Sequence, residues 1–249
     1  MRLIASGLLL LCFGEIWYFV RTDIADYAAF KLLTETAERQ RSYRVWVMKS
    51  FLLFSGTSLI GLALLGRLQA LSALPAEFGP AFRSLRSFGV PGEMVHRGFL
   101  VGFGSALLAG AVAGQVALKF IARKKVQMTL GDVEPLMPRN WAETFHTGLL
   151  SLNAGLSEEL FFRLLLPLLF TLLFGNVIAA FVVATLVFGA IHVYQGVAGV
   201  VATTVLGAAF SLLYLWTGNI WIAISVHAAL DLLGLVVRPS IARAFANLL

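Results

Sequence analysis

Residues 151–237 constrain the fold most, because this long stretch is almost free of charge. Its only charged side chains are Glu158, Glu159, Arg163 and Asp231, and its only histidines are His192 and His227. An ionised side chain near the centre of a bilayer costs roughly 3 kcal/mol on insertion scales, so the side chains retained there mark a functional site by default. We therefore take these six side chains as the candidate active site.

The composition of the whole chain predicts an integral membrane protein. Of its 249 residues, 59% are hydrophobic and 13% are charged, whereas about a quarter of the residues of a soluble domain are charged. The length allows about seven or eight spanning helices of ~20 residues each, so we expect an all-α, polytopic transmembrane helix bundle. The net charge of +6 comes from short loops between apolar runs. This pattern favours membrane lipids as partners and argues against nucleic acid.

The apolar runs predict seven spans. They lie at about residues 3–20, 45–65, 98–121, 141–174, 177–194, 197–216 and 220–237. Residues 21–44 carry both charge signs and predict a solvated, partly helical connection, and residues 66–97 predict a loop with a short interfacial helix around Phe82–Phe88. We interpret the N-terminal run as a span and not as a cleaved signal peptide, because Glu15 interrupts it and no small-x-small site precedes Trp17.

Short turns predict that the last four spans form one compact bundle. The turns at 175–176, 195–196 and 217–219 leave so little chain that neighbouring helices must be antiparallel. Asn140 and Glu143 have the spacing of a capping box, so the first of these helices should begin at Trp141. We therefore divide the chain into N-terminal spans and polar loops at 1–139, a catalytic helix bundle at 140–238 and a short tail at 239–249.

Helical spacing predicts which polar groups share a face. Glu159 precedes Arg163 by four residues, the favourable arrangement for an ion pair within one helix. Glu158 lies about 100° away around the same helix and is free to face elsewhere. We therefore assign Glu159 to a structural pair with Arg163 and leave Glu158 as the free carboxylate.

The remaining polar groups are predicted to meet Glu158 in one cavity. Glu158 lies near the start of its apolar run and His192 near the end of the next span, which places both in the same leaflet. His227 and Asp231 are four residues apart and lie midway along the last span. A single membrane histidine is as often a hydrogen-bonded packing residue as a functional one, but the concentration of all these ionisable groups in three short motifs favours a site.

Three motifs in this order resemble one known family. Glu158-Glu159-x-x-x-Arg163, Phe188-x-x-x-His192 and His227-x-x-x-Asp231 are similar to the motifs of the CPBP family, the CAAX protease and bacteriocin-processing group of intramembrane proteases, also called Abi. The flanking sequences at 188–196 and 217–221 are similar as well. The resemblance covers about residues 140–237, and the first three spans show none.

The resemblance implies an intramembrane endopeptidase. Glu158 with His192 would activate water, and His227 with Asp231 would support the oxyanion, while Glu159, Arg163 and Phe188 would occupy supporting motif positions. The implied partner is a membrane-associated protein or peptide substrate: a prenylated CAAX protein, a secreted peptide precursor or a membrane-anchored sorting tail. We expect a multi-pass protein of the cell membrane, in a bacterial inner membrane, with the basic connections 21–44 and 122–139 and the tail on the cytoplasmic side.

One position departs from part of the family. Some members have asparagine where this chain has Asp231, and an ionised aspartate would repel an oxyanion. Asp231 must then be protonated, orient His227 or ligate a metal. Glu158, His192, His227 and Asp231 would also make a plausible zinc ligand set. We favour a glutamate mechanism without a cofactor and keep zinc as the alternative.

Two other classes of function compete with this interpretation. A serine protease using Ser157 and His192 is disfavoured, because Glu158 follows Ser157 where a rhomboid protease has glycine. The second class is a noncatalytic immunity or scaffold protein, or a proton-coupled transporter, that uses the same buried polar residues. Transporters of this kind favour broken helices in paired inverted halves, and the sequence contains no such pair.

Overall fold

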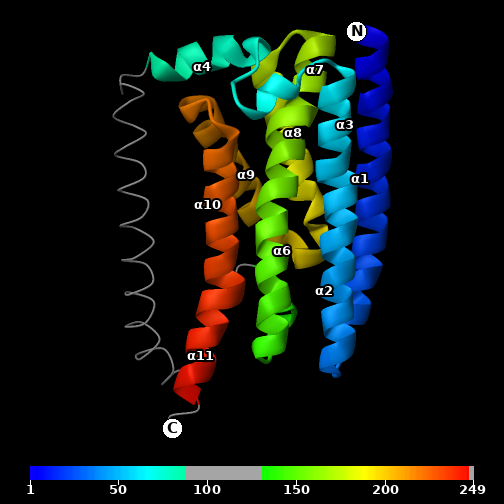
Figure 1. Cartoon of the computed structure of the whole chain (residues 1–249), viewed down its shortest axis with the longest axis vertical. Coiled ribbons are helices and arrows are strands. Elements are labelled where there is room, and N and C mark those ends of the chain that lie inside the picture. Colours follow the sequence, from blue (N-terminus) through cyan, green and yellow to red (C-terminus); the bar gives the residue numbers. More distant parts are fainter. Residues whose placement is uncertain (88–130, 247–249) are drawn as a thin grey trace.

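The computed structural model describes residues 1–87 and 131–246, and every regular element in these two ranges is helical (Figure 1). The main helices are α1 (Arg2–Phe30), α2 (Thr36–Ser50), α3 (Thr57–Leu64), α4 (Gly79–Arg86), α6 (Trp141–Glu159), α7 (Leu166–Phe174), α8 (Val177–Ile191), α9 (Gly196–Thr217), α10 (Ile220–Leu232) and α11 (Arg238–Ala246). The prediction of an all-α polytopic bundle is confirmed. The span predicted at 98–121 lies outside the described residues.

Four helices in the described ranges are long and apolar enough to cross a membrane. They are Arg2–Phe30, Thr36–Leu64, Val193–Thr217 and Ile220–Ala244. The continuous helix from Trp141 to Phe174 is longer than any of them but also carries Glu158, Glu159 and Arg163. A spanning helix that keeps three ionisable groups needs partners for them inside the bundle.

π-helical segments join shorter helices into three long ones. Phe51–Gly56 joins α2 to α3, Leu160–Leu165 joins α6 to α7, and Leu233–Val237 joins α10 to α11. The second segment ends two residues before Pro167, which has no N–H to donate back along the helix. π-helical turns occur often at functional sites, and this one directly follows Glu159.

The helices extend beyond two of the predicted boundaries. Instead of a connection over 21–44, α1 runs to Phe30 and α2 begins at Thr36. The charges there are satisfied between the two helices, where Lys49 pairs with Asp23 at 3.3 Å and with Asp26 at 2.9 Å. The segment predicted as a tail after residue 238 forms α11, which is held because Arg243 donates to the Thr144 hydroxyl at 2.6 Å.

The predicted antiparallel order of the last helices is confirmed. α7 packs on α8, α8 on α9, α9 on α10, and α10 returns to pack on α6. Gly175 and Gly218 end α7 and α9 with φ of 75° and 68°, a conformation that glycine adopts at no steric cost. Asn176 and Asn219 then cap α8 and α10 with their side-chain oxygens. These paired signals explain why two residues suffice for each turn.

The N-terminal helices share a core with the C-terminal bundle. α1 packs on α7, and α2 packs on α6. Phe54 lies 4.9 Å from Phe161 and 5.4 Å from Phe162 between ring centroids, and all three rings are fully buried. The predicted division at residue 139 stays a prediction, because the hydrophobic core is continuous across it.

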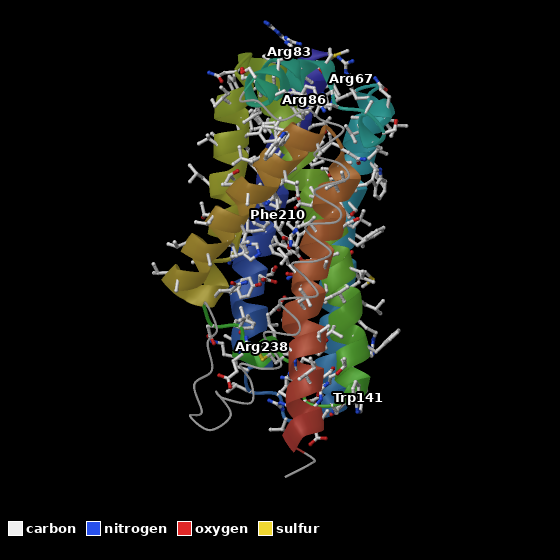
Figure 2. All side chains as sticks on the ribbon, turned by 90° about the vertical axis from the view of Figure 1, so that its left-hand side faces the viewer. Arg67, Arg83, Arg86, Trp141, Phe210 and Arg238 are labelled. Atoms are coloured by element: carbon white, nitrogen blue, oxygen red, sulfur yellow. The ribbon has the colours of Figure 1, made fainter. Side chains whose placement is uncertain are left out.

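The connection 31–35, the segment before α6 and the C-terminal helix meet at one end of the bundle. Arg139 donates to the Leu33 carbonyl at 3.0 Å, and Arg243 donates to the carbonyl of Pro138. The Asn140 cap accepts from the Glu143 amide at 2.9 Å as predicted. Figure 2 shows Trp141 and Arg238 toward this end and Arg67, Arg83 and Arg86 at the opposite end.

Candidate active site

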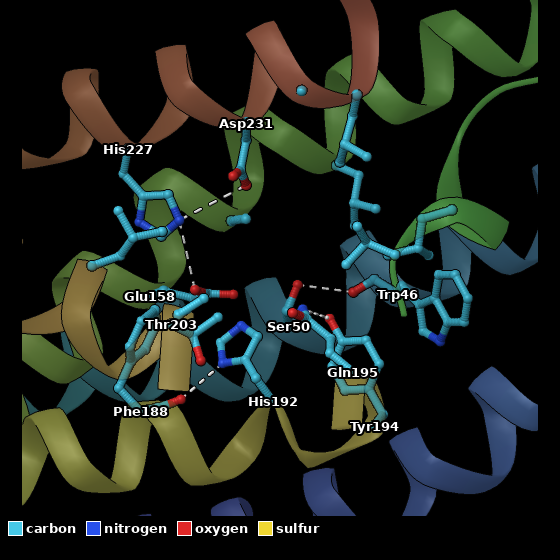
Figure 3. A pocket seen from close by; sticks show the side chains of 18 of the residues that line it. Trp46, Ser50, Glu158, Phe188, His192, Tyr194, Gln195, Thr203, His227 and Asp231 are labelled. Atoms are coloured by element: carbon cyan, nitrogen blue, oxygen red, sulfur yellow. Dashed lines mark hydrogen bonds and ion pairs between the residues drawn. The ribbon is translucent and has the colours of Figure 1, made fainter. Parts of the chain in front are cut away.

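Four of the six side chains of the predicted site line one cavity of about 350 Å³ in the bundle, and Glu159 and Arg163 lie outside its lining. Glu158 comes from α6, His192 follows α8, and His227 and Asp231 come from α10. Figure 3 shows Glu158 pointing between His192 on one side and His227 on the other. The motifs therefore converge in space although they lie on three different helices.

His227 is held from behind by Glu159. Its Nδ1 lies 2.7 Å from Glu159 Oε1, and Glu159 is fully buried. Because an ionised carboxylate can only accept, Nδ1 carries the proton and Nε2 faces the cavity. Nε2 lies 3.8 Å from Glu158 Oε2 and 3.8 Å from Asp231 Oδ2. Glu159 thus joins the first motif to the third.

The expected pair of Glu159 and Arg163 is present, with 3.3 Å between Oε2 and Nε. Arg163 is fully buried, and its guanidinium lies 4.0 Å from the Phe188 ring centroid and 5.4 Å from that of Phe210. A cation desolvated between aromatic faces is stabilised by their quadrupoles. Arg163 therefore balances the charge of Glu159 and fixes two rings of the site.

Phe210 is a site residue that the sequence did not reveal. Its ring stacks on the His227 imidazole with centroids 4.7 Å apart and an angle of 13°, and it lines the cavity. It belongs to the long apolar α9, where no motif distinguishes it from the other aromatic residues. Figure 2 shows it midway between the two ends of the bundle.

His192 is oriented by its own helix. Its Nδ1 lies 2.8 Å from the Phe188 carbonyl oxygen, so Nδ1 donates and Nε2 is left for the cavity. The Phe188 ring meets the imidazole edge-on, with centroids 4.8 Å apart. Phe188 thus supports His192 with its carbonyl and with its ring.

Two glycines allow the helices that carry the site to pack closely. A Cβ on Gly155 of α6 would lie 2.8 Å from the backbone nitrogen of Ala228, the residue after His227. A Cβ on Gly207 of α9 would lie 2.8 Å from the Phe188 ring. Both glycines allow the backbones and rings of the site to approach closely, as small residues do between membrane helices.

The cavity also extends to residues outside the three motifs. Asp23 and Tyr27 on α1, Trp46 and Ser50 on α2, and Tyr194 and Gln195 after α8 line it as well. Figure 3 shows Trp46, Tyr194 and Gln195 on the side away from His227. Sequence reasoning missed Asp23 and Trp46, because the first was assigned to a solvated connection and the second to the start of a span.

Ser157 offers no nucleophile to the cavity. Its hydroxyl donates to Asn153 at 3.1 Å and accepts from Ser55 at 3.1 Å, and it is fully buried outside the cavity lining. Asn153 in turn donates to Ser50 at 2.6 Å. This ladder joins α6 to the helix that starts at α2, so Ser157 is a packing residue.

The four candidate ligands do not fit a metal ion as they are arranged. Across residues 1–87 and 131–246, no group of three or more His, Cys, Asp and Glu side chains is placed to hold one. Nδ1 of His227 is engaged by Glu159, so only its Nε2 faces the cavity. We therefore derive no step of the chemistry through a metal.

Comparison with known proteins identifies the part of the chain that carries the site. A family model described as Type II CAAX prenyl endopeptidase Rce1-like matches residues 140–233. No curated protein and no solved structure matches the chain. The matched segment runs from the N-cap of α6 into the π-helical segment after α10 and contains all three motifs. Residues 140–233 therefore match the CPBP, or CAAX protease, family of membrane endopeptidases.

Proposed function

We propose that this chain hydrolyses a peptide bond of a membrane-associated protein or peptide inside the membrane. One observation carries the proposal: Glu158, His192, His227 and Asp231 line one cavity within a segment of the CAAX protease family. An enzyme of this kind needs a general base, a bound water and a donor for the oxyanion. The cavity offers a residue for each task.

Glu158 is the proposed general base. Its side chain is 14% exposed, so the cavity leaves it accessible while the bundle shields it from bulk water. A water held between Glu158 and Nε2 of His192 would lose a proton to the carboxylate as it attacks the carbonyl carbon. The resulting protonated Glu158 then supplies that proton to the leaving amine.

His227 is the proposed oxyanion donor. With Nδ1 bonded to Glu159, a protonated imidazole presents its second N–H from Nε2 toward the cavity. This N–H donates to the oxygen that becomes negative in the tetrahedral intermediate. Asp231, whose carboxylate lies 3.8 Å from Nε2, is assigned to orienting the imidazole, because an ionised carboxylate would repel the oxyanion.

The proposed substrates are proteins or peptides that already lie in or on the membrane. Prenylated CAAX peptides are the first class to test, because the matching family is described as a prenyl endopeptidase. Peptide precursors and membrane-anchored sorting tails are the other candidates. We further propose a bacterial inner membrane as the location, with the end formed by Lys31, Arg139 and Arg243 facing the cytoplasm.

Oxygen-18 labelling tests the proposal directly. The purified chain and its Glu158→Gln variant are placed in lipid vesicles with farnesylated and unmodified peptides in oxygen-18 water. Hydrolysis puts one oxygen from water into each new carboxylate, and we expect this product with the original chain only. Equal product with Glu158→Gln would contradict Glu158 as the base, and no cleavage of any peptide would favour a scaffold or transporter.

A further inference from the structure

The end of the cavity away from His227 is built by helices outside the family-matched segment. Trp46 of α2 and Tyr194 lie at this end (Figure 3), Tyr27 of α1 packs on Tyr194 with ring centroids 4.9 Å apart, and Phe19 and Asp23 of α1 line the cavity as well. Phe19, Asp23, Tyr27 and Trp46 precede residue 140, where the match begins. This part of the cavity can therefore recognise a feature of the substrate that the catalytic motifs do not specify.

Apart from the two histidines, the ionisable side chains that carry charge in the cavity lining are all acidic. The lining within the described residues contains three carboxylates, Asp23, Glu158 and Asp231, and neither lysine nor arginine. Glu158 and Asp231 belong to the proposed chemistry. Asp23 is 8% exposed, and among the described residues it is the one lining carboxylate that comes from α1.

Lys49 does not cancel the negative charge at this end. It pairs with Asp23 at 3.3 Å but does not line the cavity. Its ammonium also binds Asp26 at 2.9 Å and the Thr22 hydroxyl at 3.1 Å, so its three N–H donors are used. Two carboxylates and one ammonium leave a net charge of −1, and the side chain that faces the cavity is the acid.

We infer that this end of the cavity is a subsite for a lysine or arginine side chain of the substrate. The carboxylate of Asp23 would accept from the cationic head, and the rings of Phe19, Tyr27 and Trp46 would pack on the aliphatic stem. Long basic side chains bury their stems on apolar surfaces while the charge finds a polar partner, and aromatic faces attract the cation itself. A substrate carboxylate at this place would be repelled.

The helix contacts give the distance between this subsite and the proposed base. Asp23 is level with Lys49 on α2, and the neighbouring Ser50 bonds Asn153 on α6. Asn153 precedes Glu158 by five residues, which is about 7.5 Å along a helix at 1.5 Å per residue. An extended peptide covers this length with about two residues, so the basic residue is expected at least two residues from the cut.

A lysine scan in two charge variants tests the inference, which rests on the proposed function only for its cleavage readout. Ten-residue apolar peptides carry one lysine at successive positions, or methionine at the same position. Their binding to the full chain in a zwitterionic detergent is measured by fluorescence anisotropy, and their cleavage by mass spectrometry. We expect one or two positions at which lysine is preferred over methionine by about tenfold or more, as for a desolvated charge pair.

Asp23→Asn should remove the preference, and Asp26→Asn should keep it. Asp26→Asn is the control. It also removes one carboxylate of α1 that pairs with Lys49, but Asp26 does not line the cavity. If Asp23→Asn fails to fold, Lys49→Gln decides, because removing the competing ammonium should strengthen the lysine preference. Equal binding of lysine and methionine peptides, or an equal loss in both aspartate variants, would overturn the inference. Cleavage without a lysine preference would leave the protease proposal standing, whereas selective lysine binding without cleavage would leave only the subsite.

Discussion

Glu159 accepts a hydrogen bond from Nδ1 of His227 at 2.7 Å, a contact that joins α6 to α10 behind the lining of the cavity. The same carboxylate lies 3.3 Å from Arg163 on its other side. Glu159 is thus a positioning residue for His227 as well as the partner of a buried arginine. A structural ion pair alone would have no effect on the orientation of the imidazole.

Glu159→Gln is expected to lower the rate of peptide hydrolysis by about 10- to 100-fold, the usual effect of losing a carboxylate that orients a functional histidine. The amide keeps the size of the side chain but not its charge or its two acceptor oxygens. Steady-state kinetics should place the loss in kcat and not in KM. Glu143→Gln, on the same helix and paired with the buried Arg39 at 3.1 Å, is the control and should leave kcat unchanged. A Glu159→Gln enzyme with normal kcat would contradict this positioning role.

Arg163→Met is expected to lower the free energy of unfolding by about 3–5 kcal/mol, because it leaves the buried Glu159 without its cation. It also removes the guanidinium from between Phe188 and Phe210. Thermal unfolding in detergent measures the effect. The double variant Glu159→Gln/Arg163→Met should recover part of the stability, since it leaves no uncompensated charge. Additive losses in the double variant would argue that the two side chains are not coupled.

Gly155→Ala is expected to destabilise the bundle by about 1–3 kcal/mol, the usual cost of overpacking a close contact. The new Cβ would lie 2.8 Å from Ala228 and push α10, with His227, away from α6. Activity should therefore fall more than stability alone explains. Gly148→Ala on the same helix is the control, because its Cβ would meet only Val236 at 3.7 Å. Equal behaviour of the two variants would show that the α6–α10 approach is not critical.

Chelation is expected to leave the activity unchanged. No group of three or more His, Cys, Asp and Glu side chains in residues 1–87 and 131–246 is placed to hold an ion, and the proposed chemistry uses Glu158 as the base without one. Peptide cleavage is measured before and after dialysis against a strong zinc chelator. Loss of cleavage that zinc restores would replace the glutamate mechanism with a metal-dependent one.

The sequence predicted the helical class and the convergence of the motifs because both follow from local spacing. The pairs Glu159–Arg163 and His227–Asp231 are separated by four residues within one helix, so any helix brings them together. The short turns with Gly175 and Gly218 fixed the antiparallel order in the same way. The catalytic roles of Glu158, His192, His227 and Asp231 stay predictions.

The rest depends on contacts between distant helices that no local pattern encodes. The bond from His227 to Glu159, the stacking of Phe210 on His227 and the lining by Asp23 each bring together residues of different helices. Charge along residues 21–44 suggested a connection, whereas the structure satisfies much of that charge between α1 and α2 through Lys49. A charged stretch is compatible with a helix when its partners lie on the next helix.

The central claim is that Glu158 makes this chain a protease, and one comparison tests it most directly. Membrane fractions of cells with the original chain and of cells with Glu158→Gln, at matched expression, are analysed for peptide termini by mass spectrometry. The account predicts at least one new terminus that is present only with the original chain, which would also reveal the substrate and its cut site. Identical termini in both cells, with the variant folded in the membrane, would contradict it.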